Sequence, residues 1–348
     1  MNTNPSVSIG APVLFLFGVF LGSWWLTGRL RRYALSRRLL DIPNPRSSHT
    51  AMIPRGGGVA IALATLIALP MLAAIDLLPW RSALGLFGGG AGAAAIGFVD
   101  DHGHIPPRWR LLGHLGAAVL VLVSLGGLPP IPFLEVTLQV RWLGYVLAAL
   151  YLVWLLNLTN FMDGIDGIAG VETVTVAVGG ALLQFLVVPG NGQWIVPLVL
   201  ASATLGFLVW NWPPARIFMG DAGSGFLGLM LAALSLQAAW VAPPLFWSWL
   251  VLLGVFIVDA TVTLLRRVLS GERFYEAHRT HAYQHATQRW AAHRPITLAV
   301  GAINLCWLLP LATLVATESL NGLLGVLIGF APLVAAALWL RAGKPLLA

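Results

Sequence analysis

Acidic residues gather in three short segments whose neighbours point to metal and phosphate chemistry. Asp100 and Asp101 are adjacent, Asp163 and Asp166 each precede a glycine, and Asp221 lies between glycines in FMGDAGSG (218–225). Carboxylate oxygens are ligands that Mg²⁺ prefers, and of two adjacent acids one can act as a base while the other holds a partner. Turns and helix caps are the competing explanation for each segment taken alone. Together the segments predict a site that binds a hard cation and moves protons.

The segment NLTNFMDGIDG (157–167) is the densest of the three. Its Asn157 and Asn160 add amide oxygens to the two acids, so the segment can ligate a cation or hydrogen-bond a polar ligand. It contains no Arg or Lys that would neutralise the acids internally. Its Asp–Gly pairs favour tight turns in which the backbone approaches a ligand closely.

Basic residues on other segments supply the charge that a phosphate needs, since arginine binds phosphate through a bidentate fork. The candidates are Arg46, His49 and Arg55 before a run of glycines, Arg108 and Arg110 after the Asp pair, and Arg279 and His281 in a late polar segment. For each of them, attraction to anionic lipid headgroups remains the alternative explanation.

Two further features stay open. Asp259 lies inside an apolar run, seven residues before Arg266, which fits either a functional acid or an internal salt bridge or packing hydrogen bond. His278, His281 and His285 are spaced so that a helix would align them. A zinc site is less favoured there than phosphate contact or a surface position, because the pattern H-E-x-x-H is absent.

The elements that must position these residues are membrane helices. Hydrophobic residues make up 58% of the 348 and charged residues only 9%, against about 25% charged in soluble proteins. Mean hydropathy is +0.83. Runs of about 20 apolar residues cross a bilayer as helices. The chain therefore predicts an all-α polytopic membrane protein, one integral-membrane domain over 1–348. We expect about eleven spans, near 11–28, 57–75, 82–99, 111–128, 141–157, 168–188, 193–210, 222–241, 244–265, 296–317 and 320–341.

Charge on the connecting loops predicts the orientation. Of the 20 Arg and Lys residues, 18 fall on one set of alternate loops, and only Arg81 and Arg141 fall on the other. The Arg-rich side should be cytoplasmic, with the N-terminus outside and the C-terminus inside. All three acidic segments then open at the cytoplasmic face. The net charge of +7 is explained by this bias, so we expect no nucleic-acid partner.

The single cysteine, Cys306, excludes a disulfide framework and a Cys-based metal cluster.

The order of the motifs resembles the polyprenyl-phosphate N-acetylhexosamine-1-phosphate transferases, glycosyltransferase family 4. The resemblance is greater to the WecA- and WbpL-like branch than to the related MraY branch, whose last loop carries consecutive histidines. It rests on DIPNPRSSH (41–49), PRGGG (54–58), Asp100–Asp101, NLTNFMDGIDG (157–167), FMGDAGSGFLG (218–228) and HRTHAYQH (278–285).

The resemblance implies a reaction and its partners. A UDP-N-acetylhexosamine would give its sugar-1-phosphate to undecaprenyl phosphate, with release of UMP and formation of undecaprenyl-diphospho-sugar. This would be the initiating step of O-antigen, lipopolysaccharide or other cell-wall and cell-envelope glycan synthesis. The implied location is the bacterial inner (plasma) membrane, in contact with membrane lipid, and the implied cofactor is Mg²⁺, with Mn²⁺ as a substitute. Direct attack by the lipid phosphate is favoured over a two-step route through a phosphorylated Asp.

The resemblance also implies roles for individual residues. Asp221 matches the main metal ligand, Asn160 assists it, and Asp100 matches the base, with Asp101 and Asp163 as the other catalytic acids. Asn157, Asp166, Arg46, His49, Arg108, Arg110, Arg279 and His281 would bind substrate. Tyr283 stands where a second histidine is found in related sequences, which leaves His281 as the firmer pyrophosphate contact.

Other interpretations compete with this one. A polytopic transporter of a small anionic solute would also have many helices, but its polar site would lie near the bilayer midplane. A CDP-alcohol phosphotransferase would need an Arg that DGIDGIAG (163–170) lacks. A small-residue face over 88–92 fits either a homodimer or packing within one chain. The sugar, the polyprenol length and the pathway are not encoded in these motifs.

Overall fold

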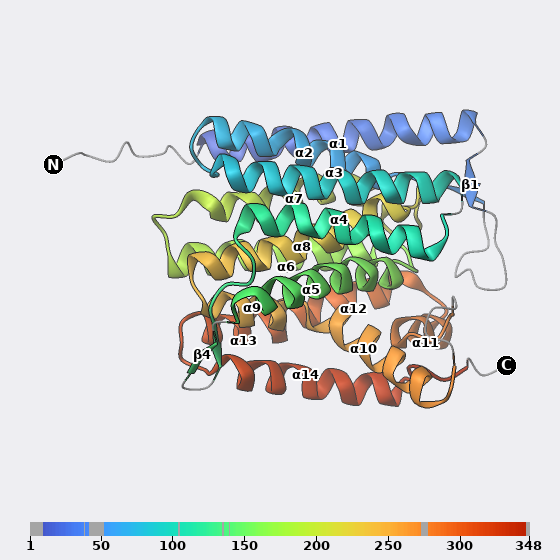
Figure 1. The fold of residues 1–348 in the computed structure, drawn as a ribbon. Helices are drawn as coiled ribbons and strands as arrows, with labels where there is room; N and C mark the ends of the chain where they lie inside the picture. Colours follow the sequence, from blue (N-terminus) through green and yellow to red (C-terminus); the bar gives the residue numbers. More distant parts are fainter. Residues whose placement is uncertain are drawn as a thin grey trace.

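The computed structural model describes residues 10–37, 39–41, 52–103, 105–133, 136–138, 140–272 and 278–345. Long helices dominate this part of the chain (Figure 1). The helices are α1 (Gly10–Ser36), α2 (Gly58–Ala74), α3 (Trp80–His102), α4 (Pro107–Leu125), α5 (Arg141–Met162), α6 (Ile168–Val187), η1 (Gly192–Trp194), α7 (Ile195–Asn211), α8 (Asp221–Val241), α9 (Pro244–Leu252), α10 (Gly254–Leu269), α11 (Ala282–Trp290), α12 (His293–Ile303), η2 (Asn304–Leu308), α13 (Leu309–Ala316) and α14 (Gly322–Trp339). The strands are β1 (Leu40–Asp41), β2 (Ile53–Pro54), β3 (Ile131–Phe133) and β4 (Val136–Leu138).

Each of the eleven predicted segments is helical, and the fold is that of an all-α polytopic membrane protein. Within the described ranges, nine helices are long and apolar enough to cross a membrane, with η1–α7 and α12–η2–α13 each forming one span. The predicted span over 244–265 is helical but broken. The chain breaks between α9 and α10, which meet at a 70° bend and together make up a tenth candidate. The apolar α2 has 17 residues and is shorter than the nine candidates.

Helix α8 is the centre of the bundle. In the most apolar 18-residue stretch of α8, 89% of the residues are buried. The corresponding share is 17% in α1 and in α14, which lie at opposite edges of the bundle (Figure 1). The main neighbours of α8 are α3 and α5. A residue at the start of α8 is therefore surrounded by protein rather than by lipid.

Glycines let α2 and α3 touch the first turn of α8. A Cβ at Gly58 would collide with the backbone of Gly223, and a Cβ at Gly97 with the backbone of Asp221 and Ala222. The small-residue face over 88–92 packs against α4 and α8 within the chain. It is therefore engaged inside the molecule and gives no support for a homodimer.

The connections at the two ends of the bundle differ. At one end, the stretch 126–140 contains the antiparallel pair β3–β4. At the other end lie the pair β1–β2, the short helix α11 and the start of α8 (Figure 1). The end of α3 and the connection from α5 to α6 reach this same end, so the acidic segments meet there.

Candidate active site

The first turn of α8 is the framework on which the site is built. Gly220 precedes it with a φ of 78°, a conformation that suits glycine. The Asp101 carboxylate accepts hydrogen bonds from the backbone N–H of Asp221 (2.9 Å) and of Ala222 (3.1 Å). A carboxylate at a helix N-terminus satisfies free N–H groups and the helix dipole. Asp101 on α3 thus caps α8 and, being only 3% exposed, fixes the position of Asp221 from behind.

Asp100 lies beside Asp221 and pairs with the Arg110 guanidinium. Its carboxylate accepts hydrogen bonds from Arg110 Nη1 (2.6 Å) and from the backbone N–H of Ile105 (2.8 Å). Its carboxylate also lies close enough to that of Asp221 for the two groups to interact. The structure therefore brings Asp100, Arg110 and Asp221 together, as the sequence predicts.

The two asparagines of α5 face α8. Asn160 Nδ2 donates a hydrogen bond to Ser224 Oγ (2.9 Å), and the Asn160 amide also contacts the Asp221 carboxylate. Asn157 lies about one turn earlier, donates to the Val153 carbonyl (2.7 Å), and lines a small space behind Asp221 together with Arg110. Both amides are within the site that the sequence predicts.

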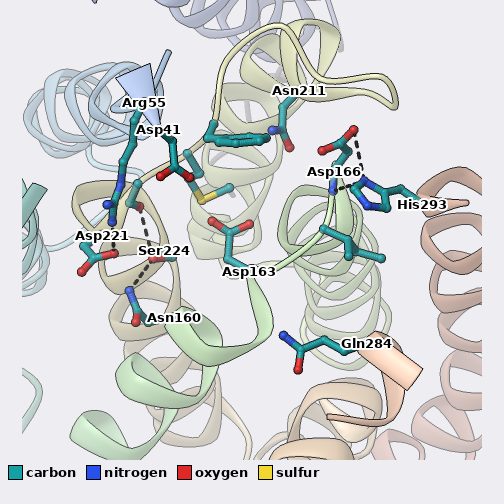
Figure 2. Close-up of a pocket in the computed structure, with 15 residues that line it drawn as sticks. Asp41, Arg55, Asn160, Asp163, Asp166, Asn211, Asp221, Ser224, Gln284 and His293 are labelled. Carbon is teal, nitrogen blue, oxygen red and sulfur yellow. Dashed lines mark hydrogen bonds and ion pairs between the residues drawn. The ribbon is translucent and has the colours of Figure 1, made fainter. Parts of the chain in front are cut away.

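In front of Asp221 is a cavity of about 240 Å³ (Figure 2). Its polar lining consists of Asp41, Arg55, Asn160, Asp163, Asp166, Asn211, Asp221, Ser224, Gln284 and His293. Asp163 projects into its middle in Figure 2, and its side chain makes no hydrogen bond within the described residues. Burial, and then the nearby negative charge of Asp221, raise the pKa of Asp163 to about 7.

Asp166 lies at the far side of the cavity and joins three elements (Figure 2). Its carboxylate accepts the backbone N–H of Ala215 (3.0 Å) and lies 3.2 Å from His293 Nδ1, while its carbonyl accepts Thr297 Oγ1 (2.8 Å). Asn211 Oδ1 accepts the next backbone N–H, that of Gly167 (2.9 Å). The 163–167 loop is thereby tied to the segment before α8 and to α12.

The predicted basic residues are divided between three places. Arg110 is in the site, whereas Arg108 is exposed, with its guanidinium 5.9 Å from the Trp109 ring centre. Arg279 and His281 do not line the cavity, and Arg279 Nε has no hydrogen-bond partner within the described ranges. Arg46 and His49 lie outside the described residues.

His281 and Asp259 form a unit beside the cavity. The Asp259 carboxylate accepts the backbone N–H of Ala282 (2.8 Å) and of Tyr283 (2.9 Å), and lies 3.3 Å from His281 Nδ1. Asp259 on α10 therefore caps the N-terminus of α11. Arg266 does not pair with Asp259 but donates a hydrogen bond to the Ala342 carbonyl. The expectation that one helix aligns the three histidines is wrong, because α11 begins only after His281.

Several cavity residues were not singled out as site residues from the sequence. Asp41 lies within a quoted motif, and Gln284 directly follows the Tyr283 that breaks the histidine pattern. Arg55, by contrast, is among the predicted phosphate-binding candidates, and it lines the cavity. Asn211 and His293 stand at helix ends, where a lone polar residue has an ordinary capping explanation. No spacing signal in the sequence links them to the acids, so only the tertiary structure reveals them.

The donor set of the cavity suits a hard cation shared with a phosphate. Among the described residues, no three His, Cys, Asp or Glu side chains form a ready-made metal cage. Mg²⁺, however, is usually held by one or two carboxylates plus substrate phosphates and water. Asp221, 25% exposed and next to Asn160, fits that kind of site. The cavity is lined by four carboxylates and one arginine, so a diphosphate would be repelled unless a cation accompanied it.

Comparison with known proteins agrees with this geometry. Residues 83–239 match the pattern of Glycosyl transferase family 4. The phospho-N-acetylmuramoyl-pentapeptide-transferase of Synechococcus elongatus is 30% identical over 266 residues, 71% of this chain and 69% of that protein. The probable undecaprenyl-phosphate N-acetylglucosaminyl 1-phosphate transferase of Bacillus subtilis is 28% identical over 80% of this chain and 78% of its own. The decaprenyl-phosphate N-acetylglucosaminephosphotransferase of Mycobacterium tuberculosis is 27% identical over 80% and 76%.

Proposed function

Because the chain belongs to glycosyl transferase family 4, we propose that it transfers a sugar-1-phosphate from a nucleotide sugar to a polyprenyl phosphate. The observation that carries the proposal is the convergence of Asp100, Asn160 and Asp221 at one end of the bundle, beside a cavity. Relatives named for this kind of transfer cover most of the chain. The donor would be a UDP-N-acetylhexosamine and the acceptor undecaprenyl phosphate, with UMP as the leaving product.

Asp221 and Asn160 would hold Mg²⁺, or Mn²⁺ in its place. When bound, the ion would neutralise the donor diphosphate and stabilise charge on the departing UMP. The protein contributes the rigidity of this arrangement, since Asp101 fixes the helix that starts with Asp221. A preorganised carboxylate loses little entropy when it binds.

Asp100 and Arg110 would receive the acceptor phosphate. Arg110 lowers the repulsion between two anionic reactants, and Asp100 takes the remaining phosphate proton. A phosphate monoester has its second pKa near 6, so near pH 7 most of the acceptor has already lost this proton, and Asp100 has to take it only from the protonated minority. The lipid phosphate oxygen then bonds to the donor β-phosphorus as the bond to the UMP oxygen breaks. An enzyme–phosphosugar adduct trapped without acceptor would contradict this direct route.

The polyprenyl chain has a groove to occupy. An apolar groove of about 320 Å³ lies between α10, α11, α12 and α14. Tyr283 lines it, and the Tyr283 hydroxyl donates to the Phe161 carbonyl (3.1 Å), two residues before Asp163. Tyr283 thus stands between the groove and the cavity. This layout supports a lipid acceptor that approaches from the membrane while the nucleotide sugar enters from water.

The biological setting follows from the same proposal. The site would face the cytoplasm of a bacterium, across the inner membrane from the β3–β4 hairpin, because the Arg-rich loops lie at the site end. The product would be the lipid-linked starter of an O-antigen or another cell-envelope glycan.

The test is release of UMP by the purified protein in detergent. UDP-N-acetylglucosamine and other UDP-N-acetyl sugars would be supplied with undecaprenyl phosphate and Mg²⁺, with arms that omit lipid or contain EDTA. We expect lipid- and metal-dependent UMP, reduced at least about 100-fold by Asp221→Ala. Asp76→Asn, an exposed acid after α2 and outside the site, is the matched control and should match wild type. Folded protein that releases no UMP from any donor would contradict the proposal.

A further inference from the structure

Arg55 is held in front of the site by backbone contacts on both sides. The Pro54 carbonyl accepts the backbone N–H of Phe218 (2.8 Å), and the backbone N–H of Gly57 donates to the Phe218 carbonyl (2.9 Å). The backbone N–H of Gly58 likewise donates to the Met219 carbonyl (2.9 Å). The segment that carries Arg55 is therefore attached to the segment that leads into Asp221.

The Arg55 guanidinium bridges two acids of the site, of which Figure 2 shows Asp221. Its Nε lies 2.9 Å from Asp101 Oδ1, and its Nη2 lies 2.7 Å from Asp221 Oδ1. Asp101 already accepts two backbone N–H groups and is buried, so its position does not depend on Arg55 alone. Asp221 is 25% exposed and Arg55 38% exposed, and both line the cavity. Their contact is the one that an incoming ligand can reach.

The Asp221 carboxylate cannot bind the Arg55 guanidinium and a divalent metal ion with full strength at the same time. A metal ion on Asp221 would place a double positive charge next to the guanidinium, which weakens the Arg55–Asp221 pair. The donor diphosphate that accompanies the ion offers oxygens that match the arginine fork. Arg55 remains tethered to Asp101 during such an exchange, so only a small movement is required.

We propose that Arg55 is an internal counter-cation, which occupies Asp221 in the ligand-free protein and passes to the donor diphosphate when the metal ion binds. This inference rests on the proposed function, because it takes Asp221 as the metal ligand and a diphosphate as the donor group. It gives Arg55 two effects of opposite sign. Arg55 weakens the binding of the metal ion alone and strengthens the binding of the metal–nucleotide pair.

The experiment measures binding without transfer. Purified wild type, Arg55→Gln and Arg55→Lys are titrated with Mn²⁺ alone, followed by electron paramagnetic resonance, and then with UDP at saturating Mn²⁺ by calorimetry. Arg55→Gln should bind Mn²⁺ alone about three- to tenfold more tightly and UDP at least about tenfold more weakly. Arg81→Gln, at the opposite end of the bundle, is the matched control and should leave both affinities unchanged.

Weaker Mn²⁺ binding by Arg55→Gln, or unchanged UDP affinity, would overturn the proposal. If Arg55→Gln fails to fold, Arg55→Lys decides, because it keeps the charge and loses the fork. Its Mn²⁺ affinity should stay within about twofold of wild type and its UDP affinity should fall several-fold; an unchanged UDP affinity would contradict the proposal. Neither titration contains lipid or sugar, so a wild type that releases no UMP would refute the proposed function without deciding the role of Arg55.

Discussion

The Asp163 side chain in the middle of the cavity has an unusual proton affinity. Burial, and then repulsion from Asp221, raise its pKa to about 7 from an ordinary value of 3.8. Between these two values the folded protein keeps a proton that the unfolded chain has released. The free energy of unfolding therefore falls as pH rises through this interval and levels off above about pH 7.

Replacement of Asp163 by Asn should remove that dependence. We expect the melting temperature of Asp163→Asn to exceed that of wild type by a margin that grows from pH 5 to pH 8, corresponding to about 1–3 kcal/mol at pH 8. Thermal unfolding in detergent with EDTA measures it. Parallel pH curves for the two proteins would show that Asp163 is not the group responsible.

At the residue scale, the sequence was most informative where a side chain sits in a dense motif. Asp100, Asn160, Asp163 and Asp221 were predicted as site residues, and the structure brings them together. His293 could not be found in this way, because its contact with Asp166 joins two helices far apart in the chain. Such a pair has no spacing that a sequence pattern can register.

Among the elements, the crossing of α3 and α8 sets the position of Asp221. Gly97 touches the backbone of Asp221, whereas Gly88, on the same helix, has only Leu120 Cδ1 near its Cβ position, at 3.6 Å. Gly97→Ala should push the helices apart, cost about 1–3 kcal/mol of stability, and reduce UMP release more than tenfold. Gly88→Ala is the matched control and should resemble wild type in melting temperature and rate. Equal effects of both changes would contradict this account of the crossing.

Helix α11 depends on an acid from another helix. Asp259→Asn places an amide N–H₂ against backbone N–H groups of 282–283, which leaves a buried donor unsatisfied at about 1–3 kcal/mol. We expect faster hydrogen exchange over 282–285 and roughly tenfold lower activity. Glu172→Gln is the control, since Glu172 is also a buried acid but pairs with Asn304. Unchanged exchange in Asp259→Asn would refute the capping role.

The bend between α9 and α10 shows what hydropathy misses. Residues 244–265 are predominantly apolar, so the sequence predicts one span. The chain nevertheless turns at Leu253, and Gly254 packs closely against Phe330 and Leu308 of other helices. The bend is therefore associated with tertiary packing, which redirects α10 and brings Asp259 to α11. Hydropathy registers burial in lipid or protein but not the direction of a helix.

For the whole molecule, the charge bias predicts which end of the bundle meets the cytoplasm. In a Cys306→Ser background, a cysteine at Gly190 should react with an impermeant maleimide in intact cells. A cysteine at Ser270 should react only after the inner membrane is opened. Both positions are exposed and lie at opposite ends of the bundle. The reverse labelling pattern would contradict the orientation, although the fold would stand.

The fate of the donor's β-phosphate tests the central claim most directly. Undecaprenyl phosphate and Mg²⁺ would be incubated with UDP-N-acetylglucosamine that carries ³²P at the β-position, or with another UDP-N-acetyl sugar if the panel shows it to be the donor. Sugar-1-phosphate transfer predicts that the label moves into the lipid extract together with the sugar, in amounts equal to the UMP released, and that Asp221→Ala abolishes it. Sugar in the lipid without ³²P, with UDP as the product, would contradict the claim.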